Sequence, residues 1–257
     1  MAPTPNPTRL GGLEWVRSTG GRLTAAERRR LLGAIAIGQF ENLAGRVRLR
    51  LGRLPDGARD IDVCSFEPPD SRLAREAEAA CAEQPEAIAG HSYRTWMFGL
   101  ALAALDGESL DRELFYCASL VHDFGISPSV AGRDFTLGGA DRALECAAAA
   151  GLPDADGDLI ADAICVHSTP GIRLDQDGTL GCYLQMGAMV DGAGLRMWDI
   201  SPQNVRAVLK DHPRGADFKH ELAALMRAEA RAVPGGRFSL LVKCGVPIAV
   251  GLAPFDD

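Results

Sequence analysis

The stretch Ser119-Leu-Val-His-Asp-Phe-Gly-Ile126, SLVHDFGI, ends an apolar run with a histidine, an aspartate and a glycine. The pattern of residues 111–123 predicts a helix that places Phe115, Ala118 and His122 on one stripe. Asp123 is turned about 100° away from that stripe. A helix whose apolar face ends in an imidazole and a carboxylate needs a reason for holding both, and the rest of the sequence supplies one.

The same arrangement, one ionisable group at the end of an apolar helix face, occurs three more times. His91 precedes Phe98 and Leu102, His167 follows Ile160 and Ile164, and Asp191 follows Leu184 and Gly187. A buried carboxylate without a partner costs several kcal/mol. Neutral imidazoles and anionic oxygens together are the ligands that a divalent metal binds. Four helices that each bring one such group inward therefore predict a metal site.

The chain as a whole has a mainly helical pattern. Thr24-Ala-Ala-Glu27 predicts a capping box that opens a helix running to about Ala44. The alternation of residues 46–51 predicts a half-buried strand, with 61–66 as its partner and one or two short strands between 238 and 252. Further helices are predicted at 71–83, 91–105, 111–123, 138–150, 157–168, 180–192, 201–211 and 217–232.

Length and composition limit the class of protein to which the chain can belong. A chain of 257 residues with 47% hydrophobic residues can bury a sizeable core. Its apolar runs are shorter than the roughly 18 residues of a bilayer span, and its first ten residues lack a secretory pattern, so we expect a cytoplasmic protein without a membrane partner. The seven cysteines are never spaced as C-x-x-C, which favours reduced core thiols.

Charge is distributed unevenly along the chain. Residues 1–60 carry eleven arginines and five acids, a net charge of +6, whereas the remainder carries −13. The arginines at 28–30 and 46–53 could bind a phosphate or nucleic acid, but a solvated face that pairs with the acidic remainder is favoured. We therefore expect a small-molecule substrate and no nucleic acid, and the sequence leaves a homo-oligomer open.

The order His91, His122-Asp123, Asp191 on successive helices resembles the signature of the HD-domain superfamily of metal-dependent hydrolases. The segments PPDSRLAREA, HSYRTWMFG, ASLVHDFGI, FTLGGA, AICVHSTPGI and GAMVDGAG make residues 66–210 similar to its cyanamide hydratase-like branch. The resemblance implies a helical bundle. The predicted organisation is an N-terminal helix with short strands at 1–65, an HD metal-binding domain at 66–232 and a C-terminal tail at 233–257, with a small β adjunct from 46–66 and the C-terminal segment.

For that family, the metal ligands carry over onto His91, His122, Asp123 and Asp191. One divalent ion is expected, with Zn preferred and Fe, Mn, Ni and Co compatible. Such an ion lowers the pKa of a bound water, so a metal-bound hydroxide would attack a small nitrile-like or amide-like substrate. The catalytic residues we expect are Asp123, His167 as a proton shuttle and Arg94. The rim of the pocket is expected at 124–135 and 168–179.

Three alternatives stay open at this point. Many members of the superfamily are phosphohydrolases, for which Arg94 would neutralise a phosphate. His167 could instead ligate a second ion, although the sequence offers one histidine between His122 and Asp191 where binuclear enzymes generally show two. The chain could also be a metal-stabilised sensor or scaffold without catalysis.

Overall fold

The computed structural model describes residues 9–255, and these form twelve α-helices and two short 3₁₀ helices. The fold is therefore mainly helical, as the sequence predicts. The helices are α1 (Leu13–Thr19), α2 (Ala25–Arg50), α3 (Arg72–Cys81), α4 (Glu86–Asp106), α5 (Arg112–Val121), α6 (Thr136–Ala150), α7 (Asp154–His167), α8 (Leu174–Ala193), α9 (Pro202–Asp211), α10 (Phe218–Ala232), α11 (Arg237–Lys243) and α12 (Val246–Gly251), with η1 (Val63–Ser65) and η2 (Met197–Asp199).

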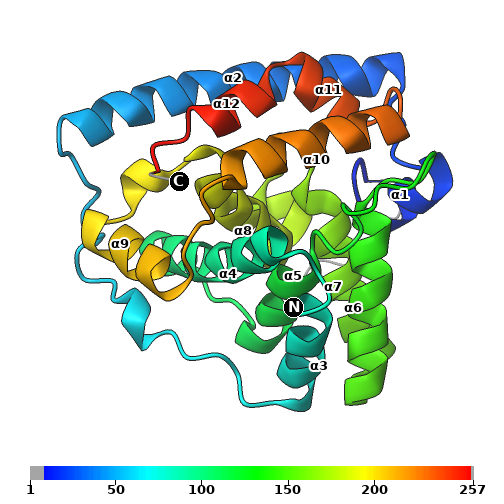
Figure 1. The fold of residues 1–257 in the computed structure, drawn as a ribbon, viewed down its shortest axis with the longest axis horizontal. Coiled ribbons are helices and arrows are strands. Elements are labelled where there is room, and N and C mark those ends of the chain that lie inside the picture. The colour runs from blue at the N-terminus through cyan, green and yellow to red at the C-terminus, as the bar shows by residue number, and fades with distance from the viewer. Residues whose placement is uncertain (1–8, 256–257) are drawn as a thin grey trace.

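The pair α4 and α8 lies in the interior, with α3, α5, α6 and α7 on one side and α10, α11 and α12 on the other (Figure 1). Two glycines allow α4 and α8 to approach closely. A Cβ on Gly187 would collide with the carbonyl oxygen of Thr95 in α4, and one on Gly99 would lie 2.9 Å from the carbonyl oxygen of Tyr183 in α8. This close contact brings His91 of α4 beside Asp191 of α8.

The predicted capping box at the start of α2 is confirmed. The Thr24 side chain accepts from the backbone N–H of Glu27, and the Glu27 carboxylate accepts from the backbone N–H of Thr24 at 2.7 Å. The helix does not end near Ala44, however, but continues to Arg50 and stops only before Gly52, whose φ is +64°. A positive φ is the conformation that glycine adopts at the end of a helix.

The predicted β adjunct is wrong. Residues 46–50 continue α2, with Leu51 as its C-cap, because arginine and leucine are good helix formers and no proline interrupts the run after the capping box. The segment 61–66 forms the single turn η1, and 238–252 forms α11 and α12. Within residues 9–255 the ladder bonding amounts to one isolated bridge, between Arg22 and Gly236.

The C-terminal segment packs on the helical bundle. α11 and α12 contact α10, and α12 also contacts α8. The boundaries predicted at residues 65 and 232 stay predictions. All seven cysteines lie in the described part of the chain, where each is a free thiol. None of the helices between residues 9 and 255 combines the length and the apolar character needed to cross a bilayer.

Candidate metal centre

Four of the predicted site residues lie at the ends of helices that meet in the interior. His91 is in the second turn of α4, His122 is the C-cap of α5, His167 is the last residue of α7, and Asp123 lies in the turn after α5. Each of the four is buried. The helix predicted to reach 123 therefore ends at Val121, which frees Asp123 from the helix and lets its carboxylate lie between the histidines.

The three imidazoles face one carboxylate. The Nε2 atoms of His91 and His122 lie 3.8 Å and 3.5 Å from oxygens of Asp123. The Nε2 atom of His167 lies 3.8 Å from Oδ1 of Asp123. Ligand atoms of His91, His122 and Asp123 all lie within 4.8 Å of one another, so these three residues could hold a metal ion.

Hydrogen bonds on the far side of each ring fix the direction of its lone pair. The Nδ1 atom of His91 donates to Asp191 at 2.7 Å, that of His122 donates to the carbonyl oxygen of Ser119 at 2.8 Å, and that of His167 donates to the carbonyl oxygen of Ile164. Because these oxygens only accept, we assign the ring proton to Nδ1 in every case. The Nε2 atoms then present lone pairs towards Asp123.

The charge state of the site fits a cation. Burial lowers the pKa of His122, and burial together with the repulsion that a protonated His122 would exert lowers the pKa of His167 to about 3. Both rings are therefore neutral at pH 7, and the buried Nε2 of His122 has no hydrogen-bond partner among the described residues. Lone pairs and a carboxylate that face one another cannot satisfy each other, whereas a divalent ion can accept all of them.

Asp191 lies behind His91 and accepts four hydrogen bonds from three residues. Its Oδ2 accepts from His91 and from Nη2 of Arg94 at 3.0 Å, and its Oδ1 accepts from Nε of Arg94 and from Nη1 of Arg214, both at 2.8 Å. Burial alone would raise the pKa of Asp191, but the hydrogen bond from His91 and the charge of Arg94 hold it well below its ordinary value. Ligation by Asp191 stays a prediction, and its contacts favour a role in orienting His91, because its carboxylate accepts from the ring nitrogen that faces away from Asp123.

Arg94 belongs to this same buried network. Besides Asp191, its guanidinium contacts the carbonyl oxygen of Pro213 at 3.1 Å and lies over the ring of Phe218. Arg214 lies over the same ring. Sequence reasoning missed Arg214, which follows α9 in a loop that shows no motif. The predicted catalytic role of Arg94 is not supported by contact with the cavity, because Arg94 is absent from its lining.

A small cavity of about 50 Å³ lies against the histidines. Its polar lining consists of His91, His122, Asp123, His167 and Ser168, and its other walls are apolar. Most of these apolar residues come from helices at or after α8, namely Ala188, Met189, Ala193, Leu222, Met226, Phe238, Leu241, Val246 and Val250. Of the rim predicted at 124–135 and 168–179, only Ile126 and Ser168 line the cavity.

A scan of the chain against protein-family models gives no match, and a search of curated proteins gives none either.

Proposed function

We propose that this protein is a metal-dependent hydratase or hydrolase that acts on a small, uncharged substrate of the nitrile or amide class. The observation that carries the proposal is the convergence of three imidazole Nε2 atoms on Asp123 beside an apolar cavity. The resemblance of residues 66–210 to the cyanamide hydratase-like branch of the HD superfamily supports the same reading.

The proposed ligands are His91, His122 and Asp123, with His167 as a fourth ligand or a proton carrier. A divalent ion bound there would polarise the substrate and make water a nucleophile at neutral pH. Asp191 keeps the proton of His91 on Nδ1, so the lone pair of Nε2 stays available to bind a metal ion. His167 Nε2 lies 3.8 Å from Asp123 Oδ1, beyond direct hydrogen-bond reach, so a proton would pass between these two atoms through one bridging water.

The substrate class follows from the cavity walls. A phosphate ester needs cationic groups near its oxygens. Neither lysine nor arginine lines the cavity, and Arg94 and Arg214 are both bonded to Asp191. A nitrile or amide presents one electrophilic carbon and little charge, which suits a site with few polar groups. The phosphohydrolase alternative therefore has less support than hydration or amide hydrolysis.

The test begins with elemental analysis of the purified protein, followed by turnover assays on small nitriles, small amides and phosphate esters with and without a chelator. We expect bound divalent metal and chelator-sensitive conversion of a nitrile or an amide. His122→Ala should remove both the metal and the activity, whereas His220→Ala, which changes an exposed histidine of α10, should remove neither. Metal without turnover on the whole panel would favour the sensor alternative, and release of phosphate would favour the phosphohydrolase.

A further inference from the structure

The outward face of α2 is apolar although none of residues 9–255 covers it. Ten large hydrophobic residues are exposed in the described part of the chain, and six of them lie between residues 32 and 51. Phe40 is 75% exposed and Leu43 63% exposed, and the others are Leu32, Ile37, Val47 and Leu51. Clustered exposed apolar residues of this kind mark an interaction surface.

The spacing of this face is that of a coiled coil. Gly33, Ile37, Phe40, Ala44, Val47 and Leu51 follow one another at alternating intervals of four and three residues, which is the a/d pattern of a heptad repeat. We call these six residues the α2 seam. The opposite face of α2 carries the buried residues Leu31, Asn42 and Gly45, and Gly45 packs directly on Trp198. The seam therefore faces away from the bundle.

We propose that the α2 seam pairs with the α2 seam of a second copy of this chain, antiparallel and about a two-fold axis near residue 42. In this register Ile37 meets Val47 of the second copy, Phe40 meets its Ala44, and Gly33 meets its Leu51. All three pairs form with the same alignment of the two helices. In two of these pairs a large side chain meets a small one. Such self-complementarity is what a two-fold interface requires.

Gly33 leaves room on the seam for a close partner. It lies in the interior of α2 with helical neighbours on both sides, and a Cβ at this position would meet nothing within 4 Å. A glycine there weakens the helix relative to alanine, and no contact among the described residues explains it, although Gly38, which lies off the seam, is equally open. In the proposed pair, Leu51 of the second copy packs on the flat backbone at Gly33.

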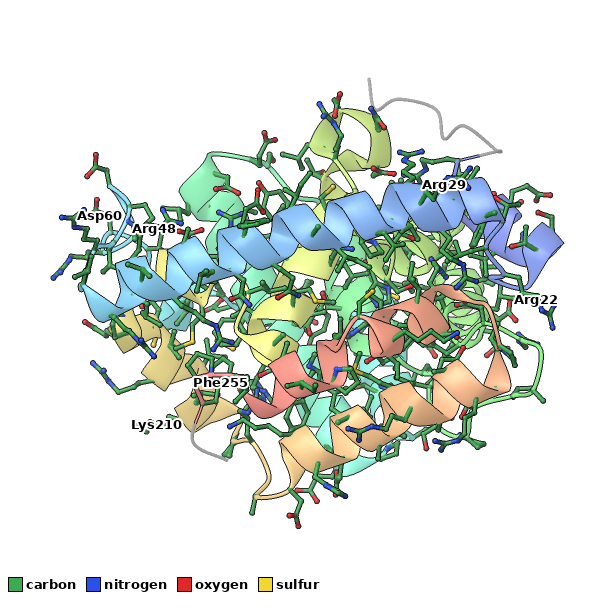
Figure 2. The ribbon with its side chains drawn as sticks, turned by 90° about the horizontal axis from the view of Figure 1, so that it is seen from above. Arg22, Arg29, Arg48, Asp60, Lys210 and Phe255 are labelled. Atoms are coloured by element: carbon green, nitrogen blue, oxygen red, sulfur yellow. The ribbon has the colours of Figure 1, made fainter. Side chains whose placement is uncertain are left out.

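Charge favours the antiparallel orientation. Figure 2 shows α2 crossing one face of the molecule, with Arg29 towards one end and Arg48 and Asp60 at the other. An antiparallel pair brings the arginines at 28–30 of one copy towards the turn of the second copy, where Arg53 and Arg59 offset Asp56 and Asp60, so this contact is less repulsive than arginines against arginines but gains no attraction. A parallel pair would place the arginines at 28–30 of both copies side by side.

The size of the contact predicts reversible association. The seam is about 27 Å long at 1.5 Å per residue. That alone is too small for the about 800 Å² per partner of a standard interface. The neighbouring helix α12 adds exposed apolar side chains beside α2, since Ile248 and Leu252 are 67% and 63% exposed and Arg46 donates to the Leu252 carbonyl oxygen at 3.2 Å. We therefore expect a dimer that dissociates on dilution.

Sedimentation of the full-length protein over an about hundredfold range of concentration tests the pairing. The native chain should change from monomer to dimer, and Phe40→Glu and Val47→Glu should stay monomeric at every concentration. Val130→Glu is the matched control, because Val130 is 53% exposed but lies outside α2. Thermal melts of all variants check that each is folded. A native protein that is monomeric throughout, or a dimer that survives both α2 substitutions, would overturn the proposal.

Disulfide trapping tests the orientation. In a Cys64→Ser background, which removes the one exposed thiol, Leu43→Cys should cross-link two copies on oxidation because residue 43 lies near its own symmetry mate. Leu51→Cys should not, because it lies at the far end of the seam from its mate. Cross-linking through residue 51 alone would show a parallel pair. A monomer that sediments with anionic lipid vesicles through Phe40 and Val47 would assign the seam to a membrane surface instead.

Discussion

Asp191 is the residue on which the buried charges of the site depend. It is the shared acceptor of Arg94 and Arg214 and also holds the ring of His91, and its side chain has no exposed surface. Removing one partner of a buried ion pair leaves the other charge uncompensated, which costs far more than the pair contributes to stability. The site and the stability of the protein are therefore coupled through one carboxylate.

Asp191→Asn should lower the free energy of unfolding by about 3–5 kcal/mol, because both guanidinium groups lose their anionic partner while they stay buried. Urea unfolding measures this loss. Asp175→Asn is the control, because Asp175 is exposed and pairs with the exposed Arg173. Exposed pairs of this kind contribute little to stability, because water and salt screen the two charges. Equal unfolding midpoints for the two variants would contradict the role assigned to Asp191.

At the scale of single residues, an apolar helical stripe predicts which side chains are buried but not which residues they contact. The apolar stripes placed His91, His122, His167 and Asp191 inward, and all four are buried. What the stripes could not show is that Asp191 is neutralised by arginines. Arg94 is close to His91 in sequence and could be considered, whereas Arg214 is reached only because the loop after α9 folds back over Asp191. Such a contact depends on tertiary structure that no local pattern contains.

At the scale of elements, the distance between α4 and α8 sets the geometry of the site. His91 and Asp191 lie on these two helices and are hydrogen-bonded across their contact. Gly187 contributes to this distance because any side chain there would meet the backbone of α4 at Thr95. Backbone cannot move aside as the end of a flexible side chain can, so the helices themselves would have to separate.

Gly187→Ala should therefore destabilise the protein by about 1–3 kcal/mol despite the higher helix propensity of alanine. It should also weaken metal binding, since it displaces His91 from Asp191. Gly192→Ala is the control on the same helix, because its Cβ would lie 3.5 Å from a methyl group of Leu222, an ordinary contact. Urea unfolding and metal titration of both variants make the comparison. If Gly187→Ala left the free energy of unfolding unchanged, α4 and α8 would be able to shift and accommodate the added methyl group.

The elements that the sequence predicted well are those with strong local signals. Ser71, Asp111 and Ser201 cap α3, α5 and α9, and the observed starts of these helices agree with the prediction to within a residue. The predicted strand at 46–51 failed because alternating arginine and aliphatic residues also suit a helix that exposes one apolar face. A period of two over six residues could not distinguish these structures, and Val47 and Leu51 proved to belong to the α2 seam.

At the scale of the whole molecule, the C-terminal helices form the wall of the cavity. Leu222 and Met226 of α10, Leu241 of α11 and Val250 of α12 lie opposite the histidines. A buried network attaches this wall to the bundle, since Arg237 of α11 donates to Asp134 at 2.9 Å and to the Cys165 carbonyl oxygen at 2.6 Å. The resemblance covers residues 66–210 and so gave no information about this wall.

Glu229 is a second attachment of the wall and should make the stability of the protein depend on pH. Its Oε1 accepts from the backbone N–H of Phe135 at 3.2 Å, and its Oε2 has no hydrogen-bond partner among the described residues. Burial, together with the charge of Asp134, raises the pKa of Glu229 to about 7 from an ordinary value of 4.5. The folded protein thus holds a proton that the unfolded chain releases at lower pH.

The direction in which stability changes with pH follows from the difference between the pKa of Glu229 in the folded protein and in the unfolded chain. The contribution of protonated Glu229 to stability is complete below pH 4.5 and is lost as the pH rises from 4.5 to about 7. Each unit of pKa difference corresponds to about 1.4 kcal/mol. Urea unfolding across this range should show the native protein losing stability relative to Glu229→Gln, which has no proton to release. Glu221→Gln, an exposed change on the same helix, should run parallel to the native protein. If Glu229→Gln also runs parallel, then Glu229 is ionised in the folded state and the attachment of α10 to Phe135 does not depend on its proton.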